Sequence, residues 1–530
     1  MARLPLCKKQ NKALYDSVVV DQGWRRRDVA APLSLVNMST QTQWHWNLLP
    51  SVILIEILAY LPLSDRISAC STCKAWRSAL FHPSFWRRIE LVFVAGEWRR
   101  LERSRFVASW AARKLRSCVI HFETVNTNCL VEVDHVLLKI TRNPQVEELI
   151  LLPSHCHTFT KGHDRPYYLR HNNNNNNNNK NNASHPRCLP CSRSSYQFIE
   201  SAQESLQSII SNSRNLRTLV LGCIQDLTDQ ADIFLPLLAH HQFNSISTLG
   251  LASVKYDPNS YALLDIPPDN FASFTALQVL TLDYDYMSDR LLGVLATPYT
   301  CPLRRLVLHV HGIDQTHQGT SEYMWYCFKQ QHPQCSLVVT LMHSYDGVEQ
   351  LGSGLLHPSM PLTHFRAFFC EWINIAALRL MSNWYSETLR HLMWVDSLDH
   401  SGWGMLTEGR DEDQETPDPL VMLAWKCKHL EHLTLFGYGY GGSDIVAIAR
   451  LRGPGLKKLW IPEDCLEADE SHELANEEDV DNIAEDVSAG LGRTWRPLTL
   501  SELHPCVRTA NSADTDQYIL PIVLSDTILS

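Results

Sequence analysis

A short aliphatic pattern recurs along most of this sequence and constrains its fold more than any other feature. In each copy, aliphatic residues occupy the first, fourth and sixth positions, as expected for a buried strand. From Leu216 onward, successive copies begin 30, 31, 26, 33, 26, 27, 41 and 26 residues apart. The copies begin at Val146, Leu216, Ile246, Leu277, Leu303, Leu389, Leu430 and Leu456, with weaker ones at Ser336 and Leu362.

Segments of helical composition lie between several of these copies. They span residues 231–240, 288–297, 372–384, 420–430 and 443–451. A single strand–turn–helix unit cannot bury its apolar side alone, so neighbouring units must stack on one another. We therefore predict an α/β fold in which the repeated units form a solenoid with a parallel sheet.

The array resembles the leucine-rich-repeat family in its spacing of buried aliphatic positions. The spacing is slightly long and uneven, and the ninth position of each copy lacks the recurrent Asn or Cys of that family. This position holds Ile224, Asp285, His311 or Tyr438. The departure leaves the curvature open, and regular α/β stacking without a true horseshoe is the alternative.

Residues between the buried leucines should point to the open side of the sheet, because side chains alternate along a strand. This row is chemically mixed and mildly basic at its far end, which favours a protein partner over a small metabolite. Every solenoid exposes such a row, so a purely structural role fits each residue equally well. The residues predicted to contact a target are Thr218, Val220, Thr281, Arg305, His391, Met393, His432, Thr434, Lys458 and Trp460.

Ahead of the array, residues 44–93 predict three short helices. Pro50 suits the first turn of the first helix, which should end near Tyr60. Ser64 and Thr72 are the predicted caps of the second and third helices. Together these helices should form a small bundle.

The first of these helices is apolar on nearly all sides between Val52 and Tyr60. A helix in a small bundle can bury only one face internally. Burying each large apolar side chain contributes about 1.5–3 kcal/mol, and leaving several of them exposed favours aggregation. We therefore expect a second protein, or another part of this chain, to cover the outer face.

The same segment resembles the F-box family. The resemblance is carried by Leu49-Pro50, Ile57-Leu58, Leu61-Pro62, Asp65 to Ile67, Cys73 to Trp76-Arg77 and Phe85-Trp86. One departure is Val52 or Ile53, where family members often carry Glu. An unrelated three-helix bundle is the alternative.

The F-box resemblance implies that this segment binds Skp1 and, through Skp1, a cullin and a RING protein. The chain would then be the substrate-recognition subunit of a ubiquitin ligase, with the repeats binding a target protein of unknown identity. An interaction scaffold without ligase function is the alternative. The residues expected to contribute to Skp1 binding are Leu49, Pro50, Ile53, Ile57, Leu58, Leu61, Ile67 and Trp76.

These features divide the chain into five predicted parts. They are a disordered segment at 1–43, an F-box at 44–90, a connector and capping repeat at 91–140, the solenoid at 141–462, and an acidic segment with a C-terminal tail at 463–530. Eight consecutive asparagines from Asn172 to Asn179 predict a disordered insertion at about 154–200. Glu463 to Asp486 carries twelve acidic residues and no Lys or Arg, which is typical of a solvated, mobile segment.

Composition limits where such a protein can act. The apolar stretch from Leu48 to Leu63 is interrupted by Pro50, Glu56 and Pro62, so no membrane partner is expected. Cysteines are scattered singly through apolar segments, as reduced core thiols are, and the first thirty residues lack a signal-peptide pattern. We expect a cytoplasmic or nuclear location, or both.

Three other sites can be considered and are disfavoured. The group His155, Cys156, His157, His163, His185, Cys188 and Cys191 could bind zinc, but a second Cys pair is absent. The glycine-rich residues 437–442 superficially resemble a dinucleotide loop, although the helix that follows is short. Residues 87–116 hold nine basic and three acidic residues, which an amphipathic connector explains better than a nucleic-acid site.

No paired carboxylates, activated nucleophile or phosphate loop emerges from the sequence. We therefore expect no metal, no cofactor and no catalysis by this chain.

Overall fold

The computed structural model describes most of the chain between residues 46 and 528. The described ranges are 46–61, 63–158, 190–298, 301–313, 317–398, 418–467, 476–510 and 512–528. The chain divides into two compact units, residues 1–89 and 90–530, and each is described by itself. The predicted disordered segment at 1–43 lies outside the described residues.

The first unit is a small bundle containing the three predicted helices. They are α2 (Ser51–Ala59), α3 (Leu63–Cys70) and α4 (Lys74–Leu80), flanked by the 3-10 helices η1 (Trp46–Leu48) and η2 (Pro83–Trp86). Pro50 precedes α2, and its carbonyl oxygen accepts the first helical hydrogen bond from the Leu54 N–H at 3.1 Å.

The predicted helix caps at Ser64 and Thr72 are wrong, by two residues and by one residue respectively. Helix α3 already begins at Leu63. The Thr72 hydroxyl donates to the Ala69 carbonyl oxygen at 2.7 Å, so it belongs to the end of α3. Cys73 caps α4 instead, because its Sγ accepts from the Trp76 N–H at 3.5 Å.

The second unit contains a 12-stranded sheet in the order β1-β2-β3-β4-β5-β6-β7-β8-β9-β10-β11-β13. The strands are β1 (Arg88–Phe93), β2 (Ser117–Phe122), β3 (Glu148–Pro153), β4 (Thr218–Val220), β5 (Thr248–Gly250), β6 (Val279–Asp283), β7 (Arg305–Val310), β8 (Ser336–Met342), β9 (Leu362–Phe368), β10 (His391–Val395), β11 (His432–Phe436) and β13 (Lys458–Trp460). From β2 to β13, each strand pairs in parallel with its neighbour. The short strands β12 (Tyr440–Gly441) and β14 (Leu466–Glu467) form a separate parallel pair.

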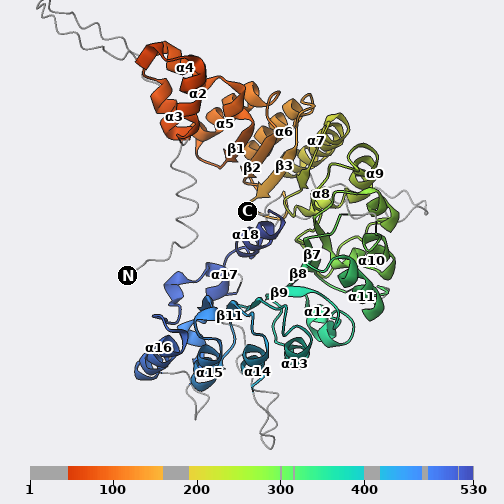
Figure 1. The fold of residues 1–530 in the computed structure, drawn as a ribbon, viewed down its shortest axis with the longest axis vertical. Helices are drawn as coiled ribbons and strands as arrows, with labels where there is room; N and C mark the ends of the chain where they lie inside the picture. Colours follow the sequence, from red (N-terminus) through yellow and green to blue (C-terminus); the bar gives the residue numbers. More distant parts are fainter. Residues whose placement is uncertain are drawn as a thin grey trace, which may run out of the picture. The chain divides into compact units, whose positions relative to one another are not determined.

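Helices follow the strands along one side of this sheet, and all of them except α16 lie between two strands in the sequence (Figure 1). They are α5 (Trp98–Ala111), α6 (Thr127–Ile140), α7 (Pro190–Asn212), α8 (Gln225–Thr228), α9 (Ala231–His241), α10 (Asp289–Leu295), α11 (Glu322–Gln331), α12 (Tyr345–Glu349), α13 (Ile375–Trp384), α14 (Pro419–Lys426), α15 (Gly442–Arg452) and α16 (Glu477–Leu491). All ten predicted copies of the aliphatic pattern lie in strands, and their central leucines, such as Leu219, Leu280 and Leu392, are buried. The predicted α/β class with a parallel sheet is confirmed.

The sheet extends into the segment ahead of residue 141. The predicted connector and capping repeat, residues 91–140, contains the end of β1, then α5, β2 and α6, and both strands belong to the same sheet as the later strands. A leucine-based pattern does not detect β2, because its buried positions carry Cys118, Ile120 and Phe122.

The predictions for two polar segments also need correction. Residues 190–200 of the predicted disordered insertion lie in α7, and residues 159–189 lie outside the described residues. Part of the acidic segment forms α16, which begins with a capping box made by Asn476 and Asp479. An amphipathic arrangement explains this helix, since Val487 and Leu491 are buried while Asp481, Glu485 and Asp486 are exposed.

Among the described helices, none combines the length and the apolar character that a bilayer crossing requires.

Candidate interaction surfaces

Helix α2 buries one side of its apolar sequence inside the first unit. Leu54 and Leu58 form the core with Cys70 and Ala79, and Leu58 is 0% exposed. The Arg66 side chain closes the end of the helix, because its Nε and one terminal nitrogen each donate at 2.9 Å to the carbonyl oxygens of Leu58 and Leu61. The orientation of α2 within the bundle is therefore fixed by both packing and hydrogen bonds.

The other side of α2 is exposed and still apolar. Val52 is 66% exposed, Ile53 43% and Tyr60 90%. The preceding turn adds Trp46 and Leu48, which are also exposed. Clustered exposure of this kind on one helix is typical of a surface that another protein covers.

The residues predicted to bind Skp1 fall into distinct structural classes. Pro50 and Ile53 are exposed, Ile57 is half-buried, Leu49, Leu61 and Trp76 pack against the bundle core, and Leu58 is part of it. Nothing is described of the Ile67 side chain. The core members would support an interaction surface indirectly, whereas Pro50 and Ile53 could touch a partner. Val52 and Tyr60 lie on the same face but were not among the predicted residues. The apolar pattern on all sides of the helix is the sequence feature that could have identified them.

In the second unit, the C-terminal helix α18 (Asp516–Thr527) lies on the side of the sheet opposite the outer helices (Figure 1). At β5, a Cβ atom added to Gly250 would lie 3.1 Å from Cγ2 of Thr527. At β9, the rings of Phe368 and Tyr518 meet edge to face with centroids 5.9 Å apart. Helix α18 therefore covers the middle of the face that was predicted to be open.

A buried ion pair fastens α18 to the strands. Arg366 of β9 bonds to both carboxylate oxygens of Asp526, and one of these bonds measures 3.0 Å. Arg305 of β7 donates to the Asp526 carbonyl oxygen at 3.0 Å. Arg366 and Asp526 are both buried, so loss of either partner would leave an uncompensated buried charge.

The position of α18 separates the residues predicted to contact a target. Val220, Thr281 and Thr434 are buried, Lys458 is exposed, and Thr218, Arg305, His391, Met393, His432 and Trp460 are half-buried. Thr218 on β4 and Arg305 on β7 are single half-buried positions, whereas accessible members of this row adjoin one another on β10, β11 and β13. There the Lys458 ammonium sits 4.8 Å from the centre of the Trp460 ring.

Three histidine rings lie next to one another, with tilted planes, across β9, β10 and β11. The ring centroids of His364 and His391 lie 3.9 Å apart, as do those of His391 and His432. Burial is the main cause that lowers the pKa of His364 to about 2, of His391 to about 3 and of His432 to about 4, and neighbouring cationic groups add to it. The rings are therefore neutral at neutral pH. His364 was not among the predicted residues, although it holds the same third position of its copy as His391 and His432.

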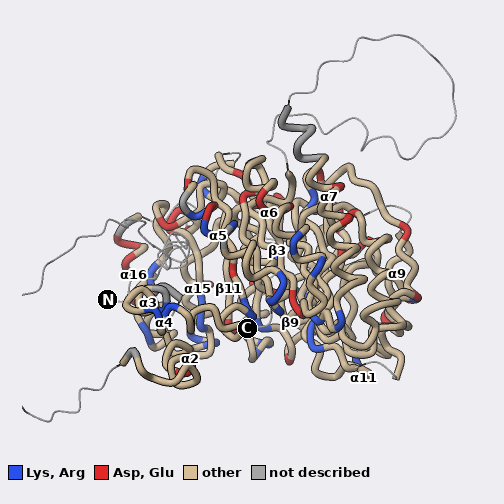
Figure 2. Tube along the Cα trace, turned by 90° about the horizontal axis from the view of Figure 1, so that it is seen from above, with Lys and Arg blue, Asp and Glu red and all other residues tan. Residues whose placement is uncertain are grey.

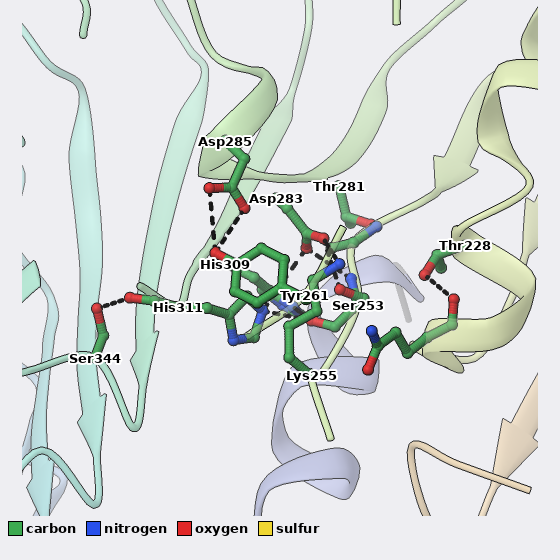
Figure 3. Close-up of polar contacts among 12 residues, drawn as sticks. Thr228, Ser253, Lys255, Tyr261, Thr281, Asp283, Asp285, His309, His311 and Ser344 are labelled. Atoms are coloured by element: carbon green, nitrogen blue, oxygen red, sulfur yellow. Dashed lines mark hydrogen bonds and ion pairs between the residues drawn. The ribbon is translucent and has the colours of Figure 1, made fainter. Parts of the chain in front are cut away.

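A largely buried polar network lies at and after the ends of β5, β6 and β7, and it includes Asp285 and His311 at the ninth position of their copies. Its members include Ser253, Lys255, Tyr261, Asp283, Asp285, His309 and His311 (Figure 3). Asp283 accepts from the N–H and the hydroxyl of Ser253 at 2.7 and 2.6 Å, and Lys255 Nζ lies 3.1 Å from it. The Tyr261 hydroxyl lies 3.1 Å from Asp285, whose pKa is raised to about 7 by burial and by the charge of Asp283. These contacts tie residues 253–261 across β6 and β7, so the network has a structural explanation.

The glycine-rich loop after β11 is explained by close packing. Gly437 has a φ of 84°, and an added Cβ would lie 2.8 Å from the Asp396 backbone. A Cβ atom added to Gly442 would lie 2.5 Å from Ile483 of α16. A Cβ atom added to Gly439 would overlap the side chain of Glu467 in β14. The glycines therefore allow neighbouring elements to approach, which removes the reason to infer a phosphate site.

The basic segment at 87–116 is internally compensated at several points. Arg116 lies 2.9 Å from Glu147, Arg105 pairs with Glu132, and Arg100 pairs with Glu97. Figure 2 shows Lys and Arg interspersed with Asp and Glu over the described part of the second unit. This distribution does not support a nucleic-acid stripe.

The candidate thiols and zinc ligands give little support to catalysis or to the zinc site considered above. Burial raises the pKa of Cys118 and of Cys370 to about 12, so these thiols stay protonated and are poor nucleophiles. His155, Cys156 and His157 are described, whereas His163, His185, Cys188 and the Cys191 side chain lie outside the described residues.

Comparison with known proteins gives matches at two scales. The F-box-like family model matches residues 46–91, which is the first unit and the start of β1. F-box only protein 33 from Homo sapiens is 28% identical over 497 residues, covering 85% of this chain and 82% of that protein. The protein of the same name from Mus musculus is also 28% identical, over 500 residues and with the same coverage. F-box/LRR-repeat protein 21 from Ovis aries is 35% identical over 80 residues, or 15% of this chain and 18% of that protein. The resemblance predicted from Leu49-Pro50 to Phe85-Trp86 is confirmed.

Proposed function

We propose that this chain, an F-box protein similar to F-box only protein 33 along most of its length, is the substrate-recognition subunit of a ubiquitin ligase. In this proposal the first unit binds Skp1, which brings a cullin and a RING protein, and the second unit binds the target. The observation that carries the proposal is the exposed apolar face of α2 inside the segment that matches the F-box-like family.

The energetics of that face support a permanent protein partner. Val52, Ile53 and Tyr60 remain largely in water although each is large and apolar or aromatic. Covering each such side chain would contribute about 1.5–3 kcal/mol, so two or three of them could anchor a stable complex. The buried residues Leu54 and Leu58 hold this face in one orientation.

The proposed contribution to the reaction is proximity. The chain would hold a target lysine near the activated ubiquitin that the recruited enzymes carry, and so make a bimolecular step effectively intramolecular. The strands β10, β11 and β13 are the proposed target-binding region, because α18 covers the middle of the row and leaves His391, His432, Lys458 and Trp460 within reach. Unpaired core cysteines such as Cys118 and Cys370 fit the proposed cytoplasmic or nuclear location.

Substitution of one exposed residue of α2 tests the Skp1 proposal. We expect Ile53→Asp to weaken co-purification of Skp1 and the cullin by at least about tenfold, since it removes one buried apolar side chain from the complex and adds a charge. Leu138→Asp is the matched control, because Leu138 is an exposed leucine on α6 of the second unit, and we expect it to retain Skp1. Circular dichroism of both variants should match the original protein.

Undiminished Skp1 binding by Ile53→Asp would overturn the assignment of this face. Absence of Skp1 from the complex of the unaltered protein would favour the alternative of a repeat scaffold without ligase function. In the same purification, a Lys458→Glu, Trp460→Ala variant should keep Skp1 and lose target proteins that accumulate when the proteasome is inhibited.

A further inference from the structure

Three side chains with metal-binding chemistry converge where the C-terminal segment meets the sheet of the second unit. His157 follows β3, whereas Asp514 and Asp516 lie at the start of α18. One potential ligand atom of each residue lies within 4.8 Å of the other two. His157 and Asp516 are buried, and Asp514 is half-buried. Residues that are far apart in the sequence therefore meet in a site shielded from solvent.

The separations in this cluster suit an ion between the side chains better than direct bonds. His157 Nε2 lies 3.8 Å from Asp514 Oδ2 and 4.0 Å from Asp516 Oδ2. Nitrogen–oxygen hydrogen bonds are shorter, at about 2.7–3.2 Å. Two ligands that share one zinc ion, each about 2.0–2.2 Å from it, lie about 3–4 Å apart. A small closure of the three side chains would bring three ligand atoms within bonding distance of one ion.

Backbone N–H groups bond to both carboxylates and restrict their positions. The Cys156 N–H donates to Asp516 Oδ2 at 2.8 Å, and the Asp516 N–H donates to Asp514 Oδ1 at 3.2 Å. Outer hydrogen bonds of this kind hold carboxylate ligands in place at metal centres. A divalent cation would also offset the repulsion between two carboxylates brought together away from water.

We propose that His157, Asp514 and Asp516 bind one divalent metal ion of the zinc class. One imidazole nitrogen and two carboxylate oxygens form a donor set that such borderline ions accept, and water can fill the remaining positions. The ion fastens the start of α18 to the end of β3, as the Arg366–Asp526 pair fastens its other end. Metal loss would therefore loosen the helix that covers the middle of the sheet. This inference does not depend on the ligase proposal.

A second group with suitable ligands, His391, Glu431 and His432, provides a matched control. Its carboxylate already bonds to two cations, since Glu431 lies 3.0 Å from Arg390 and 2.5 Å from Lys457. A divalent ion would have to displace both of them. We therefore expect this group to bind metal poorly, although its two histidines and one acid are also suitable metal ligands.

The test uses the full chain, purified without a histidine tag, loaded with Zn²⁺ and dialysed. Metal analysis should find about one zinc per chain in the original protein and in His391→Ala, His432→Ala, and none in His157→Ala, Asp516→Asn. Asp514→Asn, at the half-buried ligand, serves as a milder second variant and should weaken zinc binding. Removing the metal with a chelator should also raise amide hydrogen exchange in α18 of the original protein.

Two results would overturn the proposal. One is an original protein that retains no zinc and whose α18 exchanges at the same rate with and without the chelator. The other is a His157→Ala, Asp516→Asn variant that retains as much zinc as the original protein, which would show that the ion is not held by His157. Neither depends on assaying Skp1 or ubiquitin transfer, so failure here is distinguishable from failure of the ligase proposal.

Discussion

Helix α2 of the first unit and helix α13 of the second are similar in length and in their number of apolar residues. They differ in how many of these apolar side chains are buried. Helix α13 buries Leu378 and Met381 and turns Arg379 and Asn383 to solvent. Helix α2 buries Leu54 and Leu58 and leaves Val52 and Ile53 exposed, with Tyr60 directly after it. The apolar surface of α13 is therefore satisfied within the chain, whereas that of α2 is not.

The difference shows why amphipathicity is more informative than hydrophobicity. A helix whose apolar stripe matches the surface it packs against is explained by its own fold. A helix that also exposes apolar side chains outside that stripe is not explained by packing within its own fold, and such exposure is typical of an interaction surface. The C-terminal helix α18 therefore adds to the core of the second unit, while an apolar face of α2 in the first unit stays exposed.

The largest expected effect tests the claim that the second unit is completed by α18. Replacing Arg366 with Met would leave Asp526 buried without its partner, which should lower the free energy of unfolding by about 3–5 kcal/mol. Denaturant unfolding measures the loss, and hydrogen exchange should localise it to α18. The control is Arg290→Met, since the Arg290–Asp269 pair is exposed on both sides and should contribute less than about 1 kcal/mol. Equal effects of the two substitutions would show that α18 does not belong to the core.

The second expected effect concerns the small core of the first unit. Leu58→Ala removes a fully buried side chain and should cost about 2–5 kcal/mol, which is comparable to the whole stability of so small a bundle. We expect the α2–α4 region to lose protection in hydrogen exchange while the second unit keeps its protection. Tyr60→Ala, on the exposed side of the same helix, should change stability by less than about 0.5 kcal/mol. A uniform loss of protection over both units would contradict their independence.

The strands of the second unit were predictable because a repeated core imposes a repeated pattern. Buried leucines at fixed spacing mark β4, β6 and β11 directly. The helices of the first unit were predictable for a related reason, since prolines and short polar segments separate its apolar runs. The start of the array was not predictable, because a strand such as β2 packs equally well with Cys118 and Phe122 in place of leucine.

Contacts between segments that are distant in the sequence were the second feature that could not be predicted. The acidic residues after position 463 predict a solvated segment, but buried Val487 and Leu491 on α16 recruit part of it to the fold. Similarly, the alternation rule places Val220 and Thr281 on the open side of the sheet, and only the path of the C-terminal segment reveals that α18 covers them. Periodicity reports which face a residue takes, and it carries no information about which distant segment covers that face.

The smallest expected effect uses acidification to distinguish the two units. The adjacent His364, His391 and His432 lie in the second unit with pKa values lowered from 6.5 to about 2, 3 and 4. Below pH 6.5 the unfolded chain binds protons that the folded chain excludes, so the stability of the second unit should fall as the pH falls from 6.5 toward 4. His364→Gln should reduce this slope by up to about 1 kcal/mol per pH unit, whereas His240→Gln, at an exposed position on α9, should leave it unchanged. Denaturant unfolding at pH 7, 6 and 5 measures the slopes, and a slope unaffected by His364→Gln would place the acid sensitivity outside these three histidines.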